Sequence, residues 1–155
     1  MSNLITAQEV IDIAFSGLTN MRAESINDAI IHVAELRYIR PAFGVKMFDK
    51  LSDDYADFTN EFVKPALAFF AKCEVLSSLS LNLSNGGVAL TNPQYSTPAT
   101  DKQRTLLYES EFSKAQTLLD DALRYVTNNI EQFPDYEQPK PKNAPRTHRI
   151  GGIIL

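Results

Sequence analysis

The feature that most constrains the fold is a long helical pattern of apolar residues in the last third of the chain. About 30 residues at 1.5 Å each predict a helix roughly 45 Å long, opened by a capping box at Thr100 and Gln103. That length exceeds a compact bundle of 155 residues, so we expect one end to project or to pack on another subunit. The pattern has steps of three or four residues: Tyr108, Phe112, Ala115, Leu119, Ala122, Val126, Ile130 and Phe133.

A second pattern of this kind precedes it and predicts another long buried helix. Pro65 interrupts the pattern, and we expect a bend or a restart there, because proline lacks an N–H and clashes with the carbonyl of Glu61. The chain has one cysteine, Cys73, which lies on this face and is predicted to be a small buried hydrophobe. The face comprises Tyr55, Phe58, Phe62, Ala66, Phe69, Cys73 and Leu76.

Two shorter helices are expected near the N-terminus. Thr6 and Glu9 have the spacing of a capping box, which predicts a helix over about Ala7–Ser16. Apolar residues at helical spacing predict the next helix over about Glu24–Tyr38. Pro41 is expected to end this helix, because the residue before a proline is driven out of the helical region.

The stretch "RYIRPAFGVKMFDKL", residues 37–51, is interpreted as a structural corner rather than a catalytic loop. Pro41 stops the helix in this interpretation, and Gly44 allows a backbone geometry that a side chain would hinder. Phe43 and Leu51 are expected to turn back into the bundle.

Residues 79–92 are predicted to form a β-hairpin. Leu79, Leu81 and Leu83 alternate with polar residues, as in a half-buried strand. A two-residue turn at Asn85 and Gly86 would place the leucines on one face with the apolar residues that follow. The predicted fold is therefore mainly α, a bundle of about four helices over residues 1–136 with this hairpin between the third and fourth.

Charge divides the chain into an acidic body and a basic arm. Residues 1–138 hold 19 acidic and 11 basic residues, a net charge of −8, whereas the last 17 residues hold four basic and no acidic residues. Residues 137–155 are rich in proline and lack a helical period, so we expect an extended arm. The chain shows no signal peptide and no apolar run that could span a membrane, and the acidic body disfavours nucleic-acid binding.

No residue pattern points to a reaction. Asp53, Asp54, Asp57 and Glu61 stand at steps that could bind a divalent cation, but capping of a helix start is the favoured interpretation. His32 has no nucleophile in a recognisable motif. We therefore predict that the protein is not an enzyme and has no catalytic, cofactor or metal site.

The stretches "LITAQEV", "YIRPAFGVKMFDKL", "FVKPALAFFAKCEVLSSLS", "NGGV" and "FPDY", taken in order, resemble the small helical head–tail connector (adaptor) proteins of tailed phages. The form is that of Bacteroidetes phages and crAss-like phages, where they are called ring proteins. The resemblance covers roughly residues 3–136. It implies a homo-oligomeric ring, commonly a dodecamer, stacked beneath the portal at the virion neck, made in the host cytoplasm. Such a ring extends the DNA channel, docks the tail and lets DNA pass without sequence-specific binding.

The arm departs from shorter members of that family and suggests a partner-binding role. We hypothesise that Arg146 and Arg149 pair with acidic groups on an adjacent ring or the portal. The aliphatic residues would fill an apolar groove or extend a sheet edge: Ile150, Ile153, Ile154 and Leu155. Two alternatives stay open at this point. One is a cytoplasmic helical protein-binding or regulatory module of a phage, and the other is a metal-dependent helical enzyme using Asp53, Asp54 and Asp57.

Overall fold

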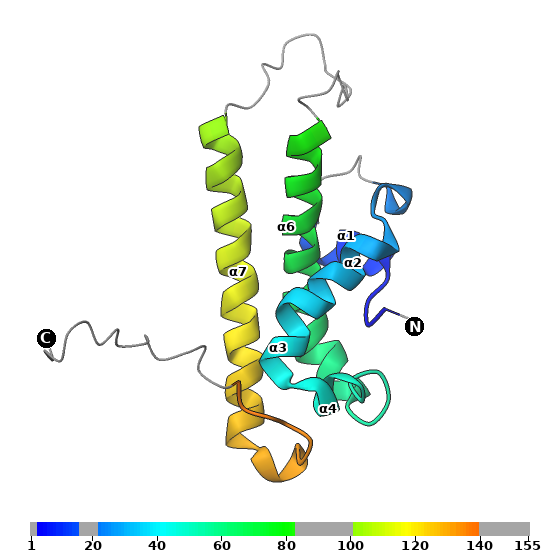
Figure 1. Ribbon diagram of the computed structural model, residues 1–155, viewed down its shortest axis with the longest axis vertical. Coiled ribbons are helices and arrows are strands. Elements are labelled where there is room, and N and C mark those ends of the chain that lie inside the picture. The colour runs from blue at the N-terminus through cyan, green and yellow to red at the C-terminus, as the bar shows by residue number, and fades with distance from the viewer. Residues whose placement is uncertain (1–2, 16–21, 83–100, 140–155) are drawn as a thin grey trace, which may run out of the picture.

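Two long antiparallel helices organise the protein (Figure 1). The computed structural model describes residues 3–15, 22–82 and 101–139, and every regular element within these ranges is helical. α6 (Lys64–Asn82) and α7 (Asp101–Asn128) pack along their lengths, and the short helices gather mainly around α6, on the side away from α7. The prediction of a mainly α fold is confirmed for these residues.

The short elements follow one another closely along the chain. In order they are α1 (Ala7–Ala14), a 3-10 turn (Ala23–Ser25), α2 (Asp28–Ala34), a π segment (Glu35–Ile39), α3 (Arg40–Phe43), α4 (Val45–Phe48), α5 (Ala56–Phe58), a second π segment (Thr59–Val63) and, after α7, a 3-10 turn (Ile130–Gln132). None of the described helices is both long enough and apolar enough to cross a membrane.

The N-terminal capping box is confirmed. The Thr6 backbone N–H donates to Glu9 Oε2 at 2.8 Å, and the Glu9 N–H donates to Thr6 Oγ1 at 3.2 Å. α2 begins at Asp28 rather than near Glu24, because the Asn27 side chain accepts the Ala29 N–H at 2.9 Å and caps the helix there.

Pro41 does not end its helix, and that prediction was wrong. Glu35–Ile39 form a π segment in which the Arg40 N–H bonds to the carbonyl five residues earlier, that of Glu35. The wider register ahead of Pro41 relieves the clash that a proline ring makes in a regular α-helix, so the chain stays helical through Phe43. The helix ends instead at Gly44, whose φ of +82° and ψ of 163° suit only glycine.

Pro65 shows the same arrangement, and the chain stays helical from Ala56 through Asn82 instead of restarting at the proline. Thr59–Val63 form a π segment, and the Lys64 N–H bonds to the Thr59 carbonyl before α6 continues in α-helical register. Both prolines thus stand two residues after a π segment.

α6 is the central helix, because its first three turns are apolar and buried on nearly every side. Cys73 is fully buried, and burial raises the pKa of its thiol to about 11, which confirms its prediction as a buried hydrophobe. Side chains of α6 with no more than 3% exposure are Ala66, Leu67, Ala68, Phe70, Ala71, Cys73 and Val75.

α7 has 28 residues, which corresponds to about 42 Å. Its predicted buried face is found at Ala115, Leu119, Ala122 and Val126. The helix ends at Asn128, before the predicted Phe133, and Ile130 is 49% exposed rather than buried. Thr100, the predicted cap, lies outside the described residues.

The predicted hairpin is not found where the structure describes its residues. Residues 79–82, the greater part of its first strand, are the last turn of α6. A helix already running from Lys64 is extended more easily than a strand is started, and leucine is a strong helix former. Asn85, Gly86 and the predicted second strand lie outside the described residues, as does the arm from residue 140 onward.

Candidate functional site

The predicted structural corner is a sharp turn between α3 and α4 with an apolar interior. Phe43, Met47 and Leu51 are fully buried, and the Phe43 ring meets the edge of the Phe58 ring at a centroid distance of 5.7 Å. The Thr59 hydroxyl donates to the Leu51 carbonyl at 2.7 Å. The corner is therefore anchored to the core through Phe43 and Leu51, as the sequence predicted.

The chain that follows α7 closes over this corner. The Glu137 N–H donates to the Phe43 carbonyl at 3.3 Å. Asp135 Oδ2 accepts hydrogen bonds from Lys50 Nζ at 2.9 Å and from the Tyr55 hydroxyl at 2.7 Å, and these bonds lower the pKa of the Asp135 carboxyl. We call these contacts of Phe43, Lys50 and Tyr55 with Asp135 and Glu137 the clasp.

The clasp leaves little space above Gly44. A Cβ added at this glycine would lie 2.8 Å from the Cβ of Glu137, closer than real Cβ contacts come. Gly44 is therefore needed both for its positive φ and for the approach of Glu137.

An open groove of about 620 Å³ lies beside the clasp, and we call it the apolar groove. Leu36 and Val45, which are 39% and 46% exposed, lie in its wall, and Val33 next to Leu36 on the same helical face is 44% exposed. The lining residues are Leu36, Arg40, Pro41, Gly44, Val45, Glu137, Gln138 and Pro139.

A different polar group, which we call the buried seam, joins α1, α6 and α7. Lys72 Nζ lies 2.9 Å from Glu111 Oε2 and donates to the Ala14 carbonyl at 2.8 Å, at the C-terminal end of α1. Lys114 Nζ lies 2.6 Å from Glu111 Oε1. Burial raises the pKa of the Glu111 carboxyl, but the two ammonium groups outweigh it, so the net shift is downward.

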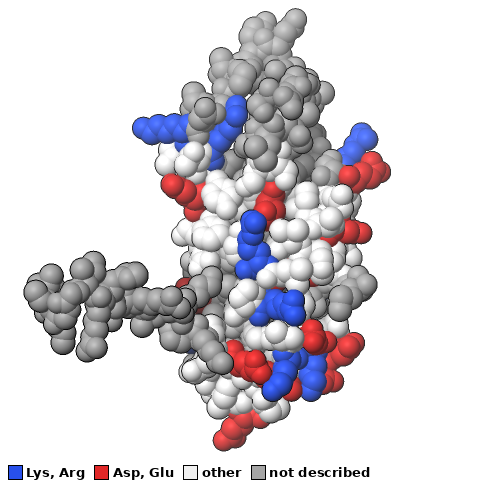
Figure 2. All heavy atoms as spheres, in the orientation of Figure 1, with Lys and Arg blue, Asp and Glu red and all other residues white. Residues whose placement is uncertain are grey.

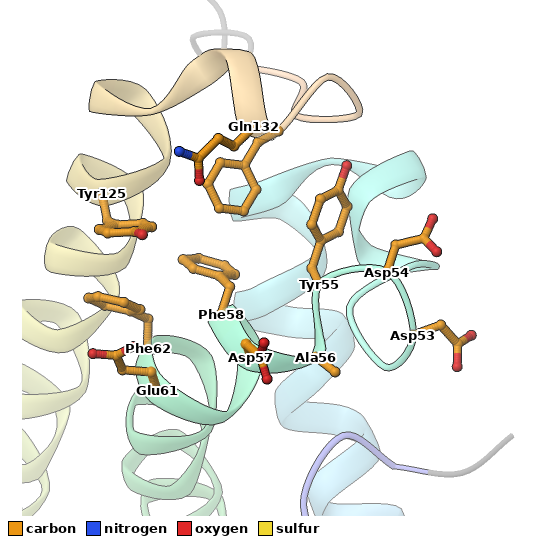
Figure 3. A pocket seen from close by; sticks show the side chains of 11 residues that line it. Asp53, Asp54, Tyr55, Ala56, Asp57, Phe58, Glu61, Phe62, Tyr125 and Gln132 are labelled. Carbon is orange, nitrogen blue, oxygen red and sulfur yellow. The ribbon is translucent and has the colours of Figure 1, made fainter.

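The carboxylates of the metal alternative do not converge. The four carboxylates border one open hollow of about 370 Å³, whose other walls are mainly aromatic: Tyr55, Phe58, Phe62, Tyr125 and Phe133. Asp53 and Asp54 stand on the loop before α5 and point away from Asp57 and Glu61 (Figure 3). Within the described residues no three His, Cys, Asp or Glu side chains are placed to hold a metal ion.

The capping interpretation of these aspartates is also wrong for Asp53. α5 starts at Ala56, and its N-cap position is Tyr55, without a side-chain hydrogen bond. Asp57 does lie in the first turn of α5, where a negative charge complements the helix dipole.

His32 is an ordinary helix residue. Its ring is 42% exposed and its Nδ1 lies 3.3 Å from Glu35 Oε2, while Glu35 Oε1 accepts the Leu4 N–H at 2.6 Å. Glu35, Lys72 and Glu111 are buried charges that the sequence prediction missed. A signal was present for Lys72, since a charged residue within a helix that is apolar on all sides requires a buried partner.

The protein is helical, and the segment after α7 joins the corner and the groove to the pair of long helices. Residues 35–146 match the family of unknown function DUF6712, and the chain belongs to this family. The match includes the corner, the clasp, the apolar groove and both long helices. No curated protein and no solved structure matches the chain.

Proposed function

We propose that this protein is a virion structural protein that forms a ring in the head–tail connector of a tailed phage. The ring would lie beneath the portal at the neck, extend the DNA channel and dock the tail. The sequence resemblance supplies the identity of the assembly. The structural observation that carries the proposal is the presence of two separate exposed aliphatic faces on one subunit.

The first face lies on α7, where Leu106 is 55% exposed and Leu107 is 46% exposed. The second comprises Val33, Leu36 and Val45 on the side that carries the apolar groove. A ring built head to tail joins two different surfaces of successive subunits, whereas a simple dimer needs only one. Two apolar faces on different elements supply the pair of surfaces that a ring requires.

The length of α7 supports the same proposal. Among the described elements, α7 packs on α6, on the second π segment and on the turn that follows α7, and α1 and α2 pack on α6. One long side of α7 is therefore left without a covering helix (Figure 1). A neighbouring subunit could pack along that side.

Charge also fits a channel through which DNA moves. The body has a net charge of −8, which repels a phosphate backbone and avoids trapping it. Acidic and basic side chains are mixed on the face in Figure 2, and both signs gather near the end that carries α4. Lys46, Lys50, Asp54, Asp135 and Glu137 form ion pairs in this region.

The arm would join each subunit to a neighbouring protein of the neck. Arg146 and Arg149 would meet acidic groups, and Ile150, Ile153, Ile154 and Leu155 would enter an apolar site. In this proposal the protein acts by assembly, without catalysis, a cofactor or a metal.

The mass of the assemblies that the full chain forms in solution tests the proposal. Mass photometry is expected to show closed multiples of the subunit for the wild type and a large loss of these species for Leu106→Asp/Leu107→Asp. Asn60→Asp, at an exposed site outside both apolar faces, is the control and should assemble as the wild type does. A stable monomer or dimer in the wild type would instead favour the regulatory module.

A further inference from the structure

We infer that the apolar groove receives the aliphatic end of the arm from a second copy of this chain. This inference rests on the proposed ring and names the neighbour to which each arm binds. It commits to residues 150–155 of the next subunit as the occupant.

The groove and the arm are chemically matched. Leu36 and Val45 expose aliphatic surface in the groove wall, and Pro41 and Pro139 add two more apolar lining residues. The arm brings four large aliphatic residues within its last six positions: Ile150, Ile153, Ile154 and Leu155. Such a segment removes the exposed aliphatic surface from water on both partners.

Charge favours one orientation of the bound arm. Glu137 lines the groove with its side chain 51% exposed, and its carboxylate forms a 3.1 Å ion pair with Lys46, which is 71% exposed. Arg149 comes directly before Ile150, and residues 139–155 contain no acidic residue. We therefore place Arg149 at the Glu137 side of the groove and the aliphatic residues beyond it.

The length of the arm allows its aliphatic end to reach a neighbouring copy. The described chain ends at Pro139, which itself lines the groove, so the adjoining residues in the same chain are Lys140, Pro141 and Lys142. Residues 140–149 span at most about 33–36 Å when extended. A domain of this size has a radius of gyration of roughly 15 Å, so this reach is about one subunit width.

The same arrangement closes naturally into a ring. In this arrangement each subunit gives its arm to one neighbour and its groove to the arm of the other neighbour, which is a head-to-tail contact. The clasp fixes the groove wall, since the Glu137 N–H bonds to Phe43 and Asp135 bonds to Lys50 and Tyr55.

Disulfide cross-linking between differently tagged full chains tests which groove the arm enters. Val45→Cys in one chain and Ile153→Cys in the other, both with Cys73→Ser, are expected to give a covalent pair carrying both tags. Asn60→Cys is the control, because Asn60 is exposed and belongs to neither of the two apolar faces, and it should give at least tenfold less mixed product. Absence of the mixed-tag pair, together with an internal disulfide in a chain that carries both Val45→Cys and Ile153→Cys, would overturn the inference.

Peptide binding tests the groove without requiring a ring. A labelled peptide of residues 140–155 is added to the full-chain variant Ile153→Asp/Ile154→Asp, whose own arm should not compete. Binding by fluorescence anisotropy should weaken at least tenfold when Val45→Asp or Leu36→Asp is added. Thr117→Asp should leave it unchanged.

The outcomes separate this inference from the proposed function. Rings that form while the peptide ignores Val45→Asp and Leu36→Asp would overturn the groove assignment and leave the ring intact. Mixed-tag cross-links and groove-dependent peptide binding without closed rings would support the groove and contradict the proposed ring.

Discussion

The buried seam and the clasp both tie distant parts of the chain together with charged side chains, but they do so in different surroundings. In the seam Lys72 is 8% exposed and Glu111 is 3% exposed. In the clasp the Lys50 side chain is 45% exposed and that of Asp135 is 22% exposed. The difference indicates that removing one partner of the seam costs more stability than removing one partner of the clasp, whereas the clasp shapes the wall of the groove.

Breaking the seam on one side should have the largest effect. Lys72→Ala removes the 2.9 Å ion pair with Glu111 and the hydrogen bond to the Ala14 carbonyl. Loss of one partner of a buried pair is expected to lower the free energy of unfolding by about 3–5 kcal/mol, measured by urea denaturation. The double variant Lys72→Met/Glu111→Leu should recover most of the loss. A single variant within about 1 kcal/mol of the wild type would contradict this account.

Gly44→Ala should have the next largest effect, and it acts at the clasp. The substitution places a side chain in a backbone region that costs about 1–3 kcal/mol and brings its Cβ to 2.8 Å from Glu137 Cβ. We expect a lower unfolding free energy and weaker binding of the arm peptide. Adding Glu137→Gly should remove the contact part of the penalty and leave the backbone part. If Gly44→Ala lowers the unfolding free energy equally in the wild type and in Glu137→Gly, the close approach of Glu137 has no influence.

Asp135→Asn should have a smaller effect, because it weakens a partly exposed ion pair. A decrease in melting temperature of roughly 1–3 °C is expected by circular dichroism. Asp54→Asn is the matched control, since Asp54 contacts the same Lys50 at 3.7 Å and is 63% exposed. We expect no measurable change for the control. A larger change for Asp54→Asn than for Asp135→Asn would reverse the assignment of the Lys50 partner.

Acid should lower the stability that the buried seam and the clasp each contribute, and the variant Glu111→Gln should reveal the share of the seam. The pKa values of Glu111 and Asp135 lie below their ordinary values of 4.5 and 3.8. A carboxyl with a lowered folded pKa stabilises the protein above its unfolded pKa, and this stability is lost as the pH falls through the folded pKa. Stability should therefore decline below about pH 4.5. Thermal melts from pH 3 to 6 should show a shallower decline for Glu111→Gln, and an unchanged slope would contradict the role of Glu111.

The sequence predicted the elements whose signals are local. The Thr6 and Glu9 capping box and the buried face of α7 both depend on residues three or four positions apart, and both are found. The alternation of Leu79 and Leu81 was misleading, because it does not exclude a helix that is already running through α6. Pro41 was misread because the preceding π segment is not visible in the residue pattern.

The candidate site was less predictable, because its contacts join distant positions. Phe43, Gly44 and Leu51 could be assigned to a corner from their residue types. The pairing of Lys50 with Asp135 spans 85 residues, and the groove exists only because the segment after α7 returns to α3 and α4. No local pattern encodes that return.

We propose that this chain forms a ring at the neck of a tailed phage. Cryo-electron microscopy of the virion neck tests it most directly. We expect a ring of identical subunits beneath the portal, with α6 and α7 visible as a helical pair in each and the groove filled by a neighbouring arm. A neck whose rings are all accounted for by other chains would contradict it.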